Sequence, residues 1–208
     1  MNASPAEELR AIGSATLGES GARRMHHRVK PAWLGASVAG PAVTAKCGHA
    51  DNLAIHVAVA RCETPGAVLV VDASNPPEFG YWGEVLTTSA EARSMAGLVI
   101  DGGCRDVGAL QSHGFPVFSA LIALAGAAKI TGGTVGKTVR VGEVDVSPGD
   151  WIVGDVDGVV VIPSAGLDDV LRRARDRVKA EQEIFVALRE GATTVELLNL
   201  DPSGLDHA

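Results

Sequence analysis

The chain has 208 residues, of which 46% are hydrophobic, 4% aromatic and 21% charged, and its formal net charge is −7 at pH 7. This length suits one domain spanning residues 1–208, and the acidic balance argues against a nucleic-acid partner, because phosphate contacts need clustered Lys and Arg. The three cysteines form no Cys-x-x-Cys motif, and neither a signal peptide nor a membrane-spanning apolar run is evident, so we expect a cytoplasmic protein with no membrane partner.

The first predicted element is a helix over residues 5–13. Ser4 is its cap, Pro5 occupies its first turn, and acidic residues follow near its positive end. The basic segment 22–30 comes next. A single short basic cluster on an acidic chain favours a solvated connection over a nucleic-acid site.

Strand and helix signals then alternate. Residues 38–47 predict a strand, Asp51 precedes a predicted helix over residues 52–61, and residues 67–72 predict a second strand. Two prolines stiffen the following loop, residues 75–81, which can form a wall of a pocket.

Residues 82–106 predict a helix, a buried strand and a turn. Apolar residues at helical spacing predict a helix that starts at Trp82 and ends before Gly97. Residues 98–100 form a short apolar run typical of a strand buried on both faces. The next three residues, 101–103, contain two glycines, and we expect them to turn the chain.

The rest of the chain completes an α/β pattern. A short helix to about His113 precedes a strand over residues 116–118, and alternation with regular turns predicts an antiparallel meander over residues 132–163. Residues 164–189 predict a long amphipathic helix, with Gly191 after its end.

Three charges fall at one end of this pattern. Twenty residues separate Glu84 from Arg105, which allows a helix to run out and a strand to run back. Arg105 and Asp106 would then lie beyond the carboxyl end of a buried strand, where open α/β sheets bind ligands. The sequence therefore predicts that a ligand binds where these three charges meet.

An acidic residue, twenty residues and then Arg-Asp is also a family pattern. Supporting segments follow in the same order at residues 51–56, 68–72, 148–150 and 157–163. From about residue 38 to about 198, the chain resembles the aldolases that cleave 4-hydroxy-4-methyl-2-oxoglutarate and 4-carboxy-4-hydroxy-2-oxoadipate, whose relatives include the regulator of ribonuclease activity A. It departs from them in two ways: many members carry Asp at the position of Glu84, and residues 107–109 lack an acidic side chain.

The resemblance implies a single-domain αββα layered sandwich of the swivelling β/β/α kind. It also implies an aldolase that splits a 4-hydroxy-2-oxo acid into pyruvate and a second oxo acid, with oxaloacetate decarboxylation as a side activity. Asp106 would bind a divalent cation, Mg²⁺ or Mn²⁺, and Arg105 would stabilise the enolate. Glu84 would hold a water that accepts the hydroxyl proton, and the backbone N–H groups of Val85 and Leu86 would receive the substrate carboxylate.

The resemblance further implies a trimer or hexamer with the site between subunits. Because Asp106 and Glu84 alone hold few waters around a cation, we expect a third carboxylate from a neighbour. Glu181 is the first candidate and Glu183 the second; the alternative is that both face water.

Other reactive residues are weaker candidates. Cys104 lacks a positioned base, residues 132–138 lack the spacing of a phosphate loop, the histidines lack metal-ligand spacing, and no lysine stands in an apolar run suited to Schiff-base chemistry. These histidines and lysines are His49, His56, His113, Lys46, Lys129 and Lys137.

A non-catalytic binding protein, like the ribonuclease regulator, is the rival interpretation. Asp106 favours the enzyme, since the resemblance implies that regulators lack this metal-binding carboxylate.

Overall fold

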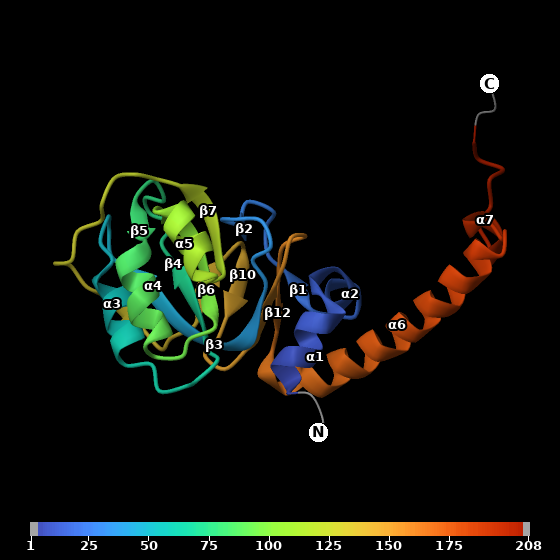
Figure 1. The fold of residues 1–208 in the computed structure, drawn as a ribbon, viewed down its shortest axis with the longest axis horizontal. Helices are drawn as coiled ribbons and strands as arrows, with labels where there is room; N and C mark the ends of the chain where they lie inside the picture. Colours follow the sequence, from blue (N-terminus) through green and yellow to red (C-terminus); the bar gives the residue numbers. More distant parts are fainter. Residues whose placement is uncertain (1–3, 206–208) are drawn as a thin grey trace.

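The computed structural model describes residues 4–205 and contains both helices and strands (Figure 1). The helices are α1 (Pro5–Ile12), α2 (Ser14–Glu19), α3 (Leu53–Ala60), α4 (Glu84–Glu91), α5 (Val107–His113), α6 (Leu167–Arg189) and α7 (Thr194–Leu197), with a 3-10 turn, η1 (Ser164–Gly166). The strands are β1 (Arg23–Arg24), β2 (Lys30–Pro31), β3 (Val38–Cys47), β4 (Val68–Asp72), β5 (Gly80–Trp82), β6 (Gly97–Cys104), β7 (Val117–Ile122), β8 (Gly133–Val135), β9 (Val139–Val141), β10 (Val144–Val146), β11 (Trp151–Gly154) and β12 (Val159–Ile162).

One long strand links the two halves of the main sheet. The strand order is β1-β12-β11-β3-β4-β6-β7-β2, with β5 beside β6 and β8 beside β3. The first part of β3 pairs with β11 in antiparallel register, and its second part pairs with β4 in parallel register. Since β3 changes partners along its length, the sheet curls, and its two halves can face each other.

Three hydrophobic cores lie between successive layers. The first joins α3, α4 and α5 to β4 and β6; the second lies between the halves of the curled sheet and the β9–β10 hairpin; the third joins β11 and β12 to α1, α2 and α6. Helix, sheet, sheet and helix therefore follow in order, which confirms the predicted αββα sandwich.

The predicted turn at residues 101–103 is wrong, because β6 continues through Cys104. Both glycines are needed for close packing within the sheet. A Cβ on Gly102 would lie 2.8 Å from the Cβ of Ala73, and one on Gly103 would lie 2.5 Å from the carbonyl oxygen of Phe79. The glycine pair marks crowding around a strand, and sequence alone does not distinguish this from a turn.

The predicted helix after Trp82 is shorter than expected. It spans Glu84–Glu91, and Val85, assigned to its apolar face, is 80% exposed. Residues 80–82, at the end of the predicted loop, form β5 and pair with β6.

The segment 132–163 is extended as predicted, although it is not one meander. β8 pairs with β3, β9 and β10 form their own hairpin, and β11 lies between β12 and β3. The basic segment 22–30 is also more than a solvated connection. Arg28 donates two hydrogen bonds, of 2.9 and 2.8 Å, to the buried carboxylate of Asp101.

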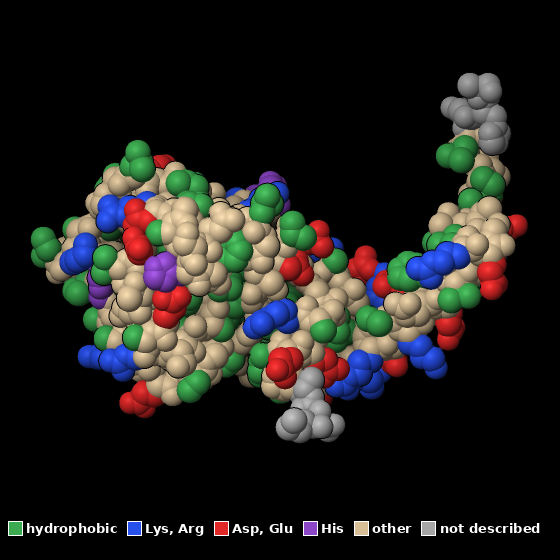
Figure 2. All heavy atoms as spheres, viewed as in Figure 1, with side chains coloured by type: hydrophobic (Ala, Val, Ile, Leu, Met, Phe, Trp, Pro, Cys, Tyr) green, Lys and Arg blue, Asp and Glu red, His purple; other side chains and the backbone are tan. Residues whose placement is uncertain are grey.

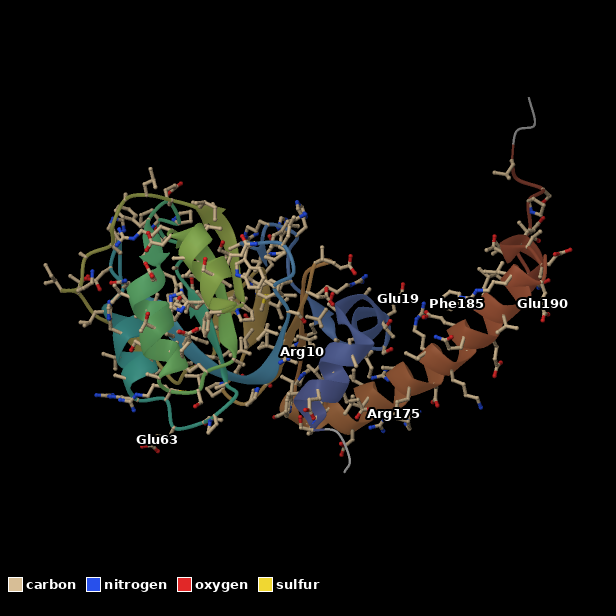
Figure 3. The ribbon with its side chains drawn as sticks, in the orientation of Figure 1. Arg10, Glu19, Glu63, Arg175, Phe185 and Glu190 are labelled. Atoms are coloured by element: carbon tan, nitrogen blue, oxygen red, sulfur yellow. The ribbon has the colours of Figure 1, made fainter. Side chains whose placement is uncertain are left out.

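The predicted helices at both ends of the chain are present. Ser4 caps α1 through a reciprocal contact with Glu7, and α6 packs against α1 through an Arg175–Glu8 ion pair of 2.6 Å. Only the first turns of α6 are buried, and the rest extends from the body as an arm (Figures 1 and 3). On this arm Phe185 is 43% exposed, and hydrophobic and charged side chains alternate along its surface (Figure 2).

Within residues 4–205, no helix combines the length and the apolar character needed to cross a membrane.

Candidate active site

A cavity of about 200 Å³ lies where β5 and β6 end and α4 and α5 begin. It is lined by residues from the start of α3, from β5 and the start of α4, from the connection between β6 and α5, and from the loop after β7. The lining residues are Asn52, His56, Gly80, Tyr81, Gly83, Val85, Leu86, Arg105, Asp106, Gly126, Ala127 and Lys129. Four of the predicted site residues, Val85, Leu86, Arg105 and Asp106, therefore share one cavity.

Asp106 lines the cavity and is held in place by its neighbours. Its backbone φ of 58° lies in the left-handed region, which Asp tolerates better than most residues. Its Oδ2 accepts a 3.1 Å hydrogen bond from the Glu84 N–H and lies 3.7 Å from Arg105 Nε. A Cβ on Gly83 would collide with the same oxygen, so Gly83 provides the space for this carboxylate.

The N-terminus of α4 points backbone donors toward the site. The first hydrogen bond of this helix runs from Thr87 N to Gly83 O at 3.1 Å. The N–H groups of Val85 and Leu86 come before this bond and are not used by the helix itself. Together with the guanidinium of Arg105, they form an environment suited to a carboxylate.

The Glu84 side chain is not part of the cavity lining. Its Oε1 lies 3.6 Å from His113 Nε2, while His113 Nδ1 lies 2.9 Å from Glu91 Oε2. The hydrogen bond to Glu91, with a smaller effect of Glu84, raises the pKa of His113. Thus the backbone of Glu84 orients Asp106, while its carboxylate lies on the rim between α4 and α5.

Three cavity residues were not assigned a role from the sequence. Asn52 and His56 come from the start of α3, and Lys129 comes from the loop after β7. Burial lowers the pKa of His56, and the positive charge of Lys129 lowers it further. Asn52 and His56 are four residues apart, the spacing of neighbours on one helix face. Many surface pairs share this spacing, so it does not single them out as site residues.

Two other predicted residues lie outside the cavity lining. Cys104 is buried, its Sγ is 3.3 Å from Ser119 Oγ, and burial raises its pKa, so it behaves as packing. Glu181 projects from α6 and lies 2.8 Å from Arg177 Nε. With Glu183, it belongs to the arm, so only a neighbouring subunit could bring these carboxylates to a site.

The residues at the cavity suit a hard cation with few protein ligands. The described hydrogen bonds of Asp106 use Oδ2, and its side chain is 41% exposed, so Oδ1 can reach an ion. Within residues 4–205, no group of three His, Cys, Asp or Glu side chains could hold a metal by itself. One carboxylate with several waters is an arrangement that Mg²⁺ accepts.

Comparison with known proteins gives a consistent result. A relative from Halalkalibacterium halodurans, named "Putative 4-hydroxy-4-methyl-2-oxoglutarate aldolase", is 32% identical over 172 residues, covering 82% of this chain and 81% of the relative. The crystal structure of Streptomyces coelicolor RraAS2, described as an unusual member of the RNase ES inhibitor RraA protein family, has a TM-score of 0.74 and 27% identity, covering 88% of this chain and 96% of that one.

A second solved structure, an uncharacterized protein from Pseudomonas syringae pv. tomato, shares the fold with a TM-score of 0.81 and 24% identity, covering 92% of this chain and 94% of that one. A model of the family described as RraA-like (Aldolase/RraA) matches residues 11–161. The chain belongs to the RraA-like family.

Proposed function

We propose that this protein is a divalent-metal-dependent aldolase. It cleaves a 4-hydroxy-2-oxo acid into pyruvate and a second oxo acid. The observation that carries the proposal is the meeting of Arg105, Asp106 and the N-terminus of α4 in one cavity. The name of the 32% identical relative supports the same reaction class.

The chain's own groups bind and stabilise the pyruvyl part of the substrate. The N–H groups of Val85 and Leu86 receive its carboxylate, and the positive end of α4 favours the negative charge. When the carbon–carbon bond breaks, its electrons move toward the keto oxygen. The guanidinium of Arg105 stabilises this developing enolate, a contribution of about 3 kcal/mol for a preorganised donor.

Asp106 would hold Mg²⁺ or Mn²⁺, which supplies Lewis-acid polarisation of the substrate oxygens when it is bound. Glu84 orients Asp106 through its backbone N–H. The role predicted for its carboxylate, holding the water that accepts the hydroxyl proton, stays a prediction. Glu84→Gln tests it, because this variant keeps the backbone contact and removes the charge.

The same enolate forms when oxaloacetate loses carbon dioxide, so we expect decarboxylation as a side activity. This second reaction needs no proton transfer from a hydroxyl group. The two activities therefore separate the groups that act on the enolate from those that act on the hydroxyl.

Pyruvate release from 4-hydroxy-4-methyl-2-oxoglutarate, measured with and without EDTA, tests the proposal. We expect activity to disappear with EDTA and to return with Mg²⁺ or Mn²⁺. Because Lys129 lines the cavity, borohydride trapping is the matched control. Activity that survives EDTA and is lost to borohydride plus substrate would replace the metal mechanism by a Schiff base on this lysine.

A non-catalytic regulator is the second candidate, and the similarity to RraAS2 favours it. Protein that binds no divalent metal and releases no pyruvate from any 4-hydroxy-2-oxo acid would establish this alternative.

We also propose that the protein works as a homo-oligomer, a trimer or a hexamer. The arm supports this proposal, because an isolated helix of its length is only marginally stable in water without a tertiary partner.

A further inference from the structure

Two buried polar atoms beside the cavity have no hydrogen-bond partner within residues 4–205. They are Oδ1 of Asn52 and Nε2 of His56. Both residues line the cavity that contains Arg105. An unpaired buried polar atom is rare in folded proteins and destabilises them, so the pair points to a group that arrives from outside the chain.

The geometry of Asn52 determines what that group must provide. Asn52 Nδ2 donates a 2.8 Å hydrogen bond to the carbonyl oxygen of Tyr81, which fixes the orientation of the amide. Oδ1 is therefore the remaining atom, and it can only accept. Among the groups of the proposed oxo-acid substrate, the ionised carboxylates and the keto oxygen have no hydrogen to donate, so the partner of Oδ1 is the hydroxyl group or a water.

His56 can complete the same contact. It lies one turn further along α3. Its backbone N–H donates a 3.3 Å hydrogen bond to the backbone carbonyl oxygen of Asn52, which places the two side chains on neighbouring turns. Burial and the charge of Lys129 lower the pKa of His56 and favour the neutral ring, while the charge of Asp51 has the opposite effect. The other titratable groups at the cavity are Tyr81, Arg105 and Asp106. A neutral imidazole with its hydrogen on Nε2 donates to an oxygen and leaves that oxygen free to donate in turn.

We propose that Asn52 and His56 form the subsite for the hydroxyl group of the substrate. In the bound substrate, before any bond breaks, the hydroxyl donates to Oδ1 of Asn52 and accepts from Nε2 of His56. Asn52 positions this hydroxyl and does not take its proton, which leaves to the water that Glu84 is predicted to hold. This assignment rests on the proposed aldolase function for the identity of the substrate, and it makes the pair a determinant of specificity. Acids that carry a 4-hydroxyl group are preferred over otherwise similar acids without one.

The test compares two ligands that differ only in this hydroxyl, 4-hydroxy-2-oxoglutarate and 2-oxoglutarate. Each competes with oxaloacetate in the metal-loaded enzyme, and the initial rate of carbon dioxide release gives an apparent competition constant for each acid. For 2-oxoglutarate this is an inhibition constant, and for 4-hydroxy-2-oxoglutarate, which the enzyme also cleaves, it is the constant of a competing substrate. We expect the wild type to bind the hydroxylated acid more tightly by about tenfold or more, because a site built for a hydroxyl rejects ligands that lack it. In His56→Leu the two constants should approach each other.

Two further variants refine the result. His56→Gln places an amide near the position of Nε2 and should recover part of the preference. Asn52→Ser shortens the acceptor, and it should also lose the preference; the Asn52 side chain makes no capping hydrogen bond to α3, so this change removes none. His27→Leu is the matched control, since His27 is exposed and does not line the cavity. The melting temperature of each variant shows whether it is folded.

The outcomes are distinct. A preference that stays at the wild-type value in folded His56→Leu and Asn52→Ser overturns the subsite. If these variants bind both acids more weakly by the same factor, the pair holds only a structural water, and this result overturns the subsite as well. Should the wild type release neither pyruvate nor carbon dioxide, the proposed function fails. Calorimetric titration of the same two acids then tests the hydroxyl preference without turnover.

Discussion

Nδ1 of His113 lies 2.9 Å from Oε2 of Glu91, and Nε2 of the same ring lies 3.6 Å from Oε1 of Glu84. From the end of α5, one imidazole thus bridges the carboxylates of the first and last residues of α4, which lie about two turns apart. The first turn of α4 contributes Val85 and Leu86 to the cavity, and Asp106 directly precedes α5. The bridge therefore couples the ionisation of an exposed histidine to the packing of the site.

This bridge predicts a pH dependence of stability. The pKa of His113 is raised above its usual 6.5, first by the hydrogen bond to Glu91. A raised pKa means that the stabilisation is fully present below about pH 6.5 and is lost as pH rises through the folded-state pKa. Between about pH 6 and pH 8, the melting temperature of the wild type should fall relative to that of His113→Gln. Parallel curves for the two proteins would contradict the bridge.

Replacing Arg105 should reduce catalysis more than binding. We expect Arg105→Ala to lower kcat for pyruvate release by about 100- to 1,000-fold, because the guanidinium stabilises charge that develops as the bond breaks. Arg105→Lys should recover only part of this loss, since a point charge lacks the planar fork. Steady-state kinetics with both substrates measure the effect, and Arg93→Ala, an exposed arginine outside the cavity, is the control. A change confined to KM would show that Arg105 only binds substrate.

Replacing Asp106 should remove metal binding. Titration calorimetry with Mn²⁺ should give one site per chain in the wild type and none in Asp106→Asn. Asp176→Asn, on the exposed face of α6, provides a matched loss of one carboxylate and should bind as the wild type does. Retention of the site in Asp106→Asn would remove this residue as the ligand.

Two glycine positions make opposite predictions about the site. A Cβ on Gly83 would collide with Oδ2 of Asp106, while a Cβ on Gly108 would meet open space. Gly83→Ala should therefore displace the carboxylate and lower turnover by about tenfold or more, the sensitivity expected of catalytic geometry. Gly108→Ala, inside α5, should be active and more stable by about 0.5–1 kcal/mol. Thermal melts and kinetics of the two variants settle the comparison.

The shared-site proposal makes a prediction about Glu181. Sedimentation at micromolar concentration should show a trimer or hexamer, and Glu181→Ala should weaken metal-dependent turnover without changing the assembly. Glu183→Ala is the paired variant. A fully active monomer would remove the idea of a shared site, whereas an oligomer with active Glu181→Ala would discard only this carboxylate.

The sequence allowed the predictions that rest on local signals. Ser4 and Pro5 mark the start of α1, and the apolar run of β4 stands out because both of its faces are buried. The interval from Glu84 to Arg105 predicted that the start of α4 meets Asp106, and the Glu84 N–H donates to its Oδ2. The sequence could not show that the Glu84 carboxylate turns to His113, since this contact depends on how α5 packs against α4.

The sequence also did not predict three residues of the cavity, for a similar reason. Asn52 and His56 face the site only because α3 packs beside α4, and Lys129 arrives on a loop with no regular periodicity. Their signal in the sequence, four residues on one helix, equals that of ordinary surface pairs. The glycines at 102 and 103 led to the wrong prediction of a turn, because close packing around a strand favours glycine as much as a turn does.

The arm formed by the second part of α6 has one further consequence. Only Val170, Leu171 and Ala174 of this helix are buried, so a single helix passes from a segment fixed by the core to a segment whose order depends on what covers it. Amide hydrogen exchange should therefore be slow near Leu171 and fast near Phe185 in dilute protein, and the fast region should shrink as concentration rises. The helix would then report subunit association along its own length, residue by residue.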